Sequence, residues 1–207
     1  TLELNRQKGV LSITPNRGTA KNRQIFAGTY VMRRDLFIDM IKKAHNTSAM
    51  YSLMDWVNLM CNEMDIRGVA HRGYFGSITD FKSYYDTSMS LIDLKTARSL
   101  FDPDWPIYTR TSDSCPTQYL EGADVKASVI SNGCRIEGTI DHSILSRGCI
   151  IKKGAVIKNC VVLSGAYIGE NVHIENQVVD KHAKITHVKE LTSSEDRPGY
   201  VRRNDTL

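Results

Sequence analysis

Hydrophobic positions recur at short, regular intervals in the second half of the chain. From Gly122 onward a phrase repeats in which a turn former and a small side chain are followed by any residue and then by an aliphatic residue. The closing aliphatic residues stand at positions 125, 136, 151, 157, 168, 174 and 185, and the pairs 151/168, 157/174 and 168/185 are each seventeen residues apart. In a parallel β-helix, three short strands make a coil of about eighteen residues, and each aliphatic side chain stacks on its equivalent in the next coil. The repeat therefore predicts a parallel β-helix over residues 120–190.

Three cysteines, Cys134, Cys149 and Cys160, fall within the predicted β-helix. The corner of a triangular coil leaves no room for a large side chain, and a buried free cysteine behaves as a small apolar residue. We therefore expect these thiols to fill corners of the β-helix rather than to act as nucleophiles.

The first hundred residues follow other patterns. Segment 24–32 is rich in β-branched and aromatic residues and predicts a strand, and segment 65–78 predicts a strand that glycines interrupt. Apolar residues at helical spacing predict three amphipathic helices, and Asp35 and Asp80 stand where the first and the third would be capped. The three apolar faces consist of Phe37, Met40, Ile41 and Ala44; of Leu53, Trp56, Val57, Met60 and Cys61; and of Phe81, Tyr84, Tyr85 and Met89. Strands that alternate with helices indicate an α/β domain over residues 1–100.

Two segments show little periodicity. Residues 101–119 hold three of the five prolines and are expected to form a linker, which Trp105, Ile107 and Tyr108 would pin to one of the domains. Residues 191–207 are polar and are expected to form a tail that becomes ordered only against a partner.

Composition narrows the class of protein. The 207 residues are 41% hydrophobic and 24% charged, which is typical of a globular chain, and no apolar run is long enough to span a bilayer. The net charge of +4 comes from scattered basic residues, which argues against a nucleic-acid-binding protein. None of the five cysteines forms a C-x-x-C pair, which argues against a disulfide framework or a zinc ribbon and favours a cytoplasmic location.

Several motifs resemble one family. Residues 73–80 (GYFGSITD) resemble the G-Y-W-x-D-[IV]-G-T phrase of bacterial ADP-glucose pyrophosphorylases, the glucose-1-phosphate adenylyltransferases. Residues 26–31 (FAGTYV) resemble that family's S-M-G-x-Y-[VI] strand, residues 106–109 its P-I-Y-T phrase, and residues 128–169 its β-helix entry. The resemblance implies an α/β fold, the C-terminal part of a nucleotidyltransferase Rossmann-like domain, followed by a left-handed parallel β-helix of hexapeptide repeats.

Departures from the family pattern concern its chemistry. The aspartate of G-Y-W-x-D, which helps to hold the catalytic metal in the family, is replaced here by Ser77. The serine of the S-M-G-x-Y strand is Phe26, no E-K-P phrase precedes that strand, and residues 49–53 lack the family's Asp-Phe-Gly. Magnesium is usually held by one or two carboxylates, so losing one weakens the site severely. We therefore assign no catalytic, cofactor-binding or metal-binding residue to this chain and expect Mg²⁺ in a catalytic paralogue.

The resemblance is strongest to the non-catalytic regulatory subunit of Gram-positive bacteria. It implies a hetero-oligomer, expected to be a tetramer, with a catalytic adenylyltransferase subunit, or self-association through the β-helix. Apolar residues at 161–166 and Ile150 would suit such packing or could equally be buried under the linker. Effector contacts would be sought among Arg33, Arg34, Arg72 and Arg110. Because the chain starts at Thr1 and lacks the family's G-x-G-T-R-L loop, we expect it to be the C-terminal part of a longer protein.

Two other functions stay open at this point. One is a competent sugar nucleotidyltransferase in which Asp80 replaces the lost carboxylate, although capping of a helix also explains Asp80. The other is a hexapeptide acyltransferase with a histidine as general base. The candidates for that base are His142, His173, His182 and His187.

Overall fold

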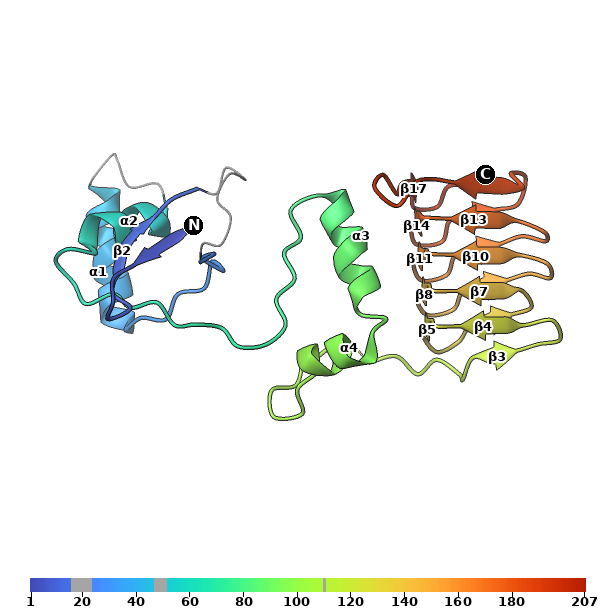
Figure 1. Cartoon of the computed structure of the whole chain (residues 1–207), viewed down its shortest axis with the longest axis horizontal. Coiled ribbons are helices and arrows are strands. Elements are labelled where there is room, and N and C mark those ends of the chain that lie inside the picture. Colours follow the sequence, from blue (N-terminus) through green and yellow to red (C-terminus); the bar gives the residue numbers. More distant parts are fainter. Residues whose placement is uncertain (16–23, 47–51, 110) are drawn as a thin grey trace. The chain divides into compact units, whose positions relative to one another are not determined.

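The chain forms two compact units, Thr1–Arg72 and Gly73–Leu207, which we describe one at a time (Figure 1). The structure is a computed structural model, and it describes residues 1–15, 24–46, 52–109 and 111–207.

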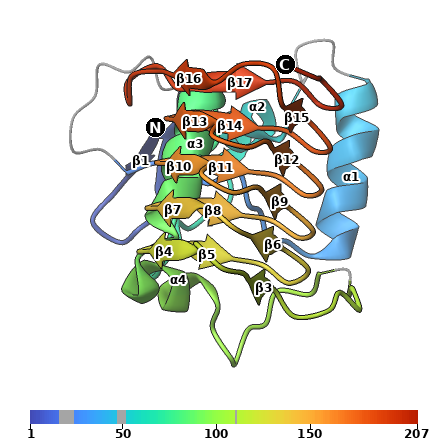
Figure 2. The same ribbon diagram turned by 90° about the vertical axis from the view of Figure 1, so that its right-hand side faces the viewer.

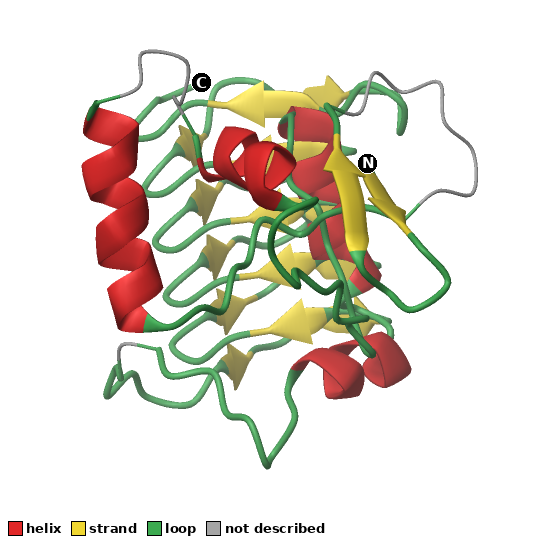
Figure 3. Ribbon diagram, turned by 90° about the vertical axis from the view of Figure 1, so that its left-hand side faces the viewer, coloured by secondary structure: helices red, strands yellow, loops and turns green. Residues whose placement is uncertain are grey.

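The first unit combines a β-hairpin with two helices. β1 (Leu2–Leu4) and β2 (Val10–Ile13) are antiparallel, and α1 (Arg34–His45) and α2 (Leu53–Met60) contribute to the same small core (Figure 3). The side chain of Asn58 ties α2 to the hairpin. Its Oδ1 accepts a 2.7 Å hydrogen bond from the Ile13 amide, and its Nδ2 donates a 2.8 Å bond to the Ile13 carbonyl. The core itself consists of Val10, Ile13, Met40, Trp56 and Val57.

Both helices predicted in this unit are confirmed, but the two predicted strands are wrong. The described residues of 24–32 and 65–78 form single β-bridges, Leu2 to Gln24 and Gly9 to Arg67, and no strand. A strand-favouring sequence forms a strand only where a neighbour supplies hydrogen-bond partners along its length. The α1 cap also differs, because Arg33 is the N-cap and Asp35 lies in the first turn.

The second unit is dominated by a parallel β-helix, as predicted (Figure 2). Its strands make three parallel sheets of five, ordered β3-β6-β9-β12-β15, β4-β7-β10-β13-β16 and β5-β8-β11-β14-β17. The strands are β3 (Gln118–Tyr119), β4 (Asp124–Lys126), β5 (Val129–Ile130), β6 (Arg135–Ile136), β7 (Thr139–Asp141), β8 (Ile144–Leu145), β9 (Ile150–Ile151), β10 (Val156–Lys158), β11 (Val161–Val162), β12 (Tyr167–Ile168), β13 (His173–Glu175), β14 (Gln177–Val179), β15 (Lys184–Ile185), β16 (Glu190–Thr192) and β17 (Gly199–Val201).

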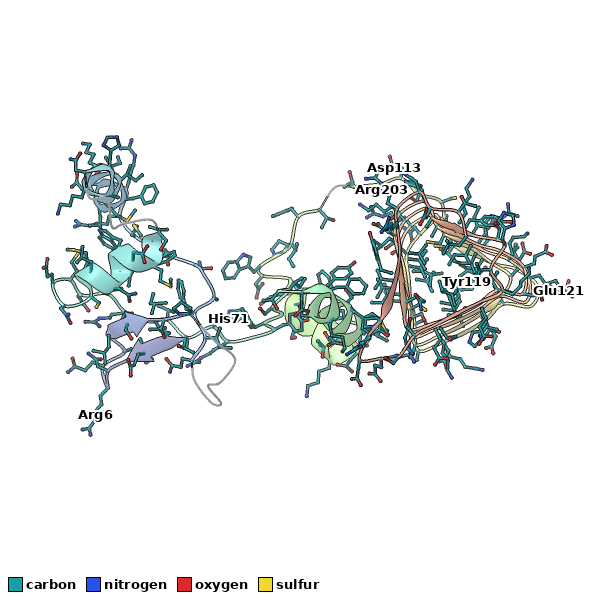
Figure 4. The ribbon with its side chains drawn as sticks, turned by 90° about the horizontal axis from the view of Figure 1, so that it is seen from above. Arg6, His71, Asp113, Tyr119, Glu121 and Arg203 are labelled. Atoms are coloured by element: carbon teal, nitrogen blue, oxygen red, sulfur yellow. The ribbon has the colours of Figure 1, made fainter. Side chains whose placement is uncertain are left out.

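The register confirms the seventeen-residue spacing. Ile168 lies opposite both Ile151 and Ile185, and Ile157 lies opposite Ile174. All five side chains are fully buried. Figure 4 looks down the coils and shows the three sheets as the sides of a triangle. Burying a ladder of large aliphatic side chains between the sheets stabilises each coil against its neighbours.

The corners contain the predicted small residues. Cys134, Cys149 and Cys160 are 1%, 0% and 0% exposed, which confirms their role as buried fillers. Burial raises the pKa of the Cys160 thiol to about 12, so this thiol stays protonated at neutral pH. Turns with a left-handed backbone connect the strands, and Gly165 (φ 72°) is one of them.

The β-helix extends beyond residues 120–190, the range predicted from the sequence repeat. Residues 191–207, expected as a tail, complete the last coil, because β13 pairs with β16 and β14 pairs with β17. The final residue folds back as well, since the Leu207 amide donates a 2.9 Å hydrogen bond to the Lys184 carbonyl. Backbone pairing to the coil below orders this segment within the chain itself.

Two helices precede the coils within the second unit. α3 (Phe81–Ser90) was predicted, whereas α4 (Leu94–Leu100) was not. The contacts therefore divide the chain after Arg72, whereas the sequence placed the division at residue 100. In the expected linker, Trp105 and Tyr108 are 83% and 92% exposed. These two side chains therefore do not pack the linker against either unit of the described chain.

Candidate functional site: segment 73–80 and helix α3

Helix α3 begins with a complete capping box. Asp80 Oδ1 accepts a 2.7 Å hydrogen bond from the Ser83 amide, and Ser83 Oγ accepts a 2.9 Å bond from the Asp80 amide. The hydrogen bond from the Ser83 amide holds the pKa of the Asp80 carboxyl below its usual value. Asp80 therefore acts as the helix cap, as the residue pattern favoured.

Apolar contacts dock α3 on the outer face of the sheet that contains β11 and β14. Tyr85, Val161 and Val178 are 2%, 3% and 1% exposed and form one buried cluster. At the N-terminal end of the helix, the rings of Phe81 and Tyr200 meet edge to face with their centroids 5.6 Å apart. Residues 161–166, for which either partner contact or burial under the linker was expected, are largely buried, and α3 covers the outward-facing Val161. Ile150 is 36% exposed.

Segment 73–80 lies against the outer side of α3. The Tyr74 hydroxyl is 3.0 Å from Ser90 Oγ. A Cβ on Gly76 would come within 2.7 Å of the Thr87 methyl group, so glycine permits this close approach. Phe75 and Ile78 are 51% and 60% exposed. Contacts within the second unit therefore tie this segment to α3.

Ser77 is exposed in this segment. Its hydroxyl is neutral, and the nearest carboxylate in sequence, that of Asp80, already accepts the cap hydrogen bond. Within the described ranges, no group of three or more histidine, cysteine, aspartate or glutamate side chains could hold a metal ion. Ser77 therefore supplies no carboxylate oxygen to a magnesium ion at this position.

The structure packs the family-equivalent Phe26 against the core of the first unit. Its ring packs edge to face on Tyr30 with the centroids 4.9 Å apart, and it is half-buried. An apolar ring in this position cannot present the hydroxyl that the resemblance associates with sugar contact. The missing Asp-Phe-Gly falls on residues 49–53, most of which lie outside the described residues.

The four histidines proposed as general bases are not brought together. His142 Nδ1 lies 2.9 Å from Asn159 Oδ1 at one corner, and His173 Nε2 lies 3.9 Å from a Glu175 carboxylate oxygen on β13. His182 occupies the turn above Gly165, and the His187 amide donates to the Leu207 carbonyl. Two hollows in the described chain, one beside the β-hairpin and one between α1 and α2, are lined by none of these histidines.

The structure describes three of the four candidate effector arginines. Arg33 and Arg34 are exposed at the start of α1, and Arg72 is the exposed last residue of the first unit. Arg110 lies outside the described residues. Sequence reasoning did not identify the docking role of Tyr85. Its position on the predicted apolar face of α3 was the available signal, but that face gave no indication of the β-helix as its partner.

Comparison with known proteins confirms the family resemblance. Residues 116–202 match the family model described as GlmU-like, C-terminal hexapeptide. The chain is 31% identical over 174 residues to the glycogen biosynthesis protein GlgD of Bacillus subtilis (strain 168). The aligned residues make up 84% of this chain and 50% of that protein.

Relatives named glucose-1-phosphate adenylyltransferase match a shorter stretch. The Bacillus thuringiensis (strain Al Hakam) protein is 37% identical over 107 residues, which is 52% of this chain and 28% of the relative. The Fervidobacterium nodosum protein is 34% identical over 113 residues, which is 55% of this chain and 27% of the relative. The matched part of the chain thus spans about half the length of GlgD and less than a third of the length of the two adenylyltransferases. In the described part of the chain, no helix is long and apolar enough to cross a membrane.

Proposed function

We propose that the protein carrying this chain is a regulatory, catalytically degenerate subunit of ADP-glucose pyrophosphorylase in glycogen biosynthesis. Its role would be to modulate a catalytic paralogue that makes ADP-glucose and pyrophosphate from ATP and glucose-1-phosphate. The match to GlgD over 84% of the chain supports the pathway. The observation that carries the proposal is Ser77, an exposed neutral hydroxyl where the family has a metal-binding carboxylate.

The chemistry of nucleotidyl transfer explains why Ser77 matters. Catalysis of phosphoryl and nucleotidyl transfer rests on positioning and on a metal ion that neutralises charge developing between the phosphates. Ser77 contributes no charge to such an ion, and Asp80 is held in the cap of α3 by the Ser83 amide. In the alternative in which Asp80 replaces the lost carboxylate, Asp80 would have to hold the metal through Oδ2 while its Oδ1 remains in the helix cap.

The remaining work of such a chain is to bind other subunits. We propose a catalytic adenylyltransferase subunit as partner, in a cytoplasmic hetero-oligomer. The β-helix is a rigid element with repeated backbone pairing, and it also holds segment 73–80 through α3. A partner bound to the β-helix could thereby influence the segment that corresponds to the family's metal-binding phrase.

The test is pyrophosphate release from ATP and glucose-1-phosphate in the presence of Mg²⁺. The full-length protein is assayed alone, and then mixed with the catalytic subunit from the same cell. We expect no release by the protein alone and an altered rate or effector response in the mixture. Turnover by the protein alone that Asp80→Asn abolishes would overturn the proposal in favour of a competent nucleotidyltransferase.

A matched pair of variants sharpens this assay. Ser77→Asp restores the family's carboxylate, and Ser77→Ala removes the hydroxyl as a control. Because Phe26 also departs from the family pattern, we expect both variants to remain inactive alone. An unaltered catalytic rate and effector response in the mixture would contradict the regulatory role.

A further inference from the structure

Two cysteine side chains of the β-helix are stacked in successive coils. β6 and β9 pair in parallel with Arg135 opposite Ile150, so the residues just before them, Cys134 and Cys149, occupy the same corner one coil apart. Both thiols donate to the same carbonyl oxygen. The Sγ atoms of Cys134 and Cys149 lie 3.2 and 3.1 Å from the oxygen of Ser146.

This arrangement is compatible with a disulfide. Neighbouring strands of a sheet lie about 4.8 Å apart, and disulfide-bonded cysteines have Cα separations of about 4.4–6.8 Å. The neighbouring Cys149 thiol lowers the pKa of Cys134. One partner of the pair thus gains the thiolate character that thiol–disulfide exchange requires.

Only two of the equivalent corner positions in successive coils from the second onward, those of Cys134 and Cys149, hold cysteine. The next two of these positions hold Ala166 and Ala183. Cys160 fills a different corner, where its Sγ donates to the Lys158 carbonyl at 3.0 Å. Cysteine at two successive positions of one corner places two thiols next to each other, an arrangement that the filler role alone does not require.

We propose that Cys134 and Cys149 form a reversible disulfide, a redox-sensitive modification site that links the second and third coils of the β-helix. In this step two S–H bonds break and one S–S bond forms, with loss of two protons and two electrons. A low-molecular-weight disulfide accepts the electrons by exchange and leaves as two thiol molecules. The protein disulfide is reduced again by the reverse reaction.

Access to the buried pair is through the first coil. Cys134 is covered by Thr117, whose Oγ1 accepts a 3.2 Å hydrogen bond from the Cys134 amide and donates a 2.7 Å bond to the Ser131 carbonyl. β3, which follows Thr117, lies at the edge of its sheet and pairs only with β6. Edge segments of this kind open locally at lower cost than global unfolding. Lifting of the segment around Thr117 would expose Cys134.

The experiment identifies which cysteines of the full 207-residue chain form disulfides when the folded protein is oxidised with diamide. Diamide is an azo compound that takes up the two hydrogens. Remaining thiols are alkylated, and the protein is digested with trypsin. Cleavage after lysine and arginine places Cys134 in peptide 127–135 and Cys149 in peptide 148–152. We expect these two peptides to be linked, with the mass of their sum less two hydrogens, and to separate on addition of dithiothreitol.

Exposed Cys115 serves as the internal control for oxidant. If Cys115 has reacted while both buried cysteines are recovered alkylated, or if either is linked to another cysteine instead, the proposal is overturned. Because this comparison uses the unaltered chain, it does not depend on the folding of any variant. In variants, Cys134→Ser should remove the linked peptide, whereas Cys160→Ser should leave it in place.

A further variant tests the route of access. Thr117→Val keeps the shape of the side chain and removes both of its hydrogen bonds, so we expect the linked peptide to form several-fold faster than in the unaltered chain. An unchanged rate would overturn the route through the first coil. The result is independent of the proposed regulatory function, because neither measurement uses a nucleotide or a partner subunit.

Discussion

The hydroxyl of Tyr85 donates a 2.7 Å hydrogen bond to the carbonyl oxygen of Asn159, and this bond joins α3 to a corner of the β-helix. Burial raises the pKa of Tyr85 to about 12, so the hydroxyl remains a donor throughout the neutral pH range. Because Tyr74 lies beside Ser90 at the C-terminal end of the helix, the docking of α3 also positions segment 73–80.

Removal of that hydroxyl tests its contribution. Tyr85→Phe keeps the ring and leaves the Asn159 carbonyl without this donor, so we expect a loss of about 1 kcal/mol in the free energy of unfolding, measured by urea denaturation. Tyr108→Phe is the matched control, because Tyr108 is 92% exposed. Equal effects of the two changes would contradict the assigned role of Tyr85.

A charged residue introduced beneath α3 should detach this helix from the β-helix. Val161 faces outward on β11 and is 3% exposed under α3, so Val161→Lys would bury an unpaired charge or displace the helix. We expect destabilisation by about 2 kcal/mol or more and faster hydrogen exchange over residues 81–90. Val129→Lys, at a 41% exposed position of the same sheet, is the control. Unchanged exchange over α3 in Val161→Lys would refute this docking.

The cap of α3 should make its stability dependent on pH. The folded pKa of Asp80 lies below its ordinary value of 3.8, chiefly because of the hydrogen bond from the Ser83 amide. A lowered carboxyl pKa contributes stability that is fully present above the ordinary value and is lost as the pH falls through the folded value. We expect exchange of the α3 amides to accelerate, relative to intrinsic rates, below about pH 4. In Asp80→Asn, which keeps an acceptor without titrating, this contribution to the acceleration should be absent.

Alanine substitutions at two glycines in turns of the β-helix would distinguish the cost of backbone strain from the cost of steric overlap. Gly165 and Gly148 have similar left-handed φ angles of 72° and 69°. A Cβ on Gly165 would overlap the His182 ring, whereas a Cβ on Gly148 would meet nothing within 4 Å. We expect Gly148→Ala to cost about 1–2 kcal/mol and Gly165→Ala to cost more, by thermal denaturation. The additional cost should disappear when His182→Ala is combined with Gly165→Ala, and its persistence would argue against the ring contact.

The sequence alone predicted those parts of the protein that depend on local pattern. The seventeen-residue spacing of Ile151, Ile168 and Ile185 predicted their stacking, because each coil repeats the conformation of the one before. Asp80 and the apolar face after it predicted α3, because a cap and a helical period are local signals. The substitution at Ser77 was likewise readable from the motif, although the packing of segment 73–80 against α3 was not.

Features that depend on partners distant in sequence were decided only by the tertiary structure. The predicted strand over 24–32 did not form, because extended backbone becomes a strand only when another strand pairs with it. The final segment became a coil because β13 and β14 offered free edges to β16 and β17. The assignment of α3 to the β-helix came from Tyr85 meeting Val161, two residues 76 positions apart in sequence. A periodic pattern specifies which side of a helix is apolar, whereas only the folded chain determines which surface covers it.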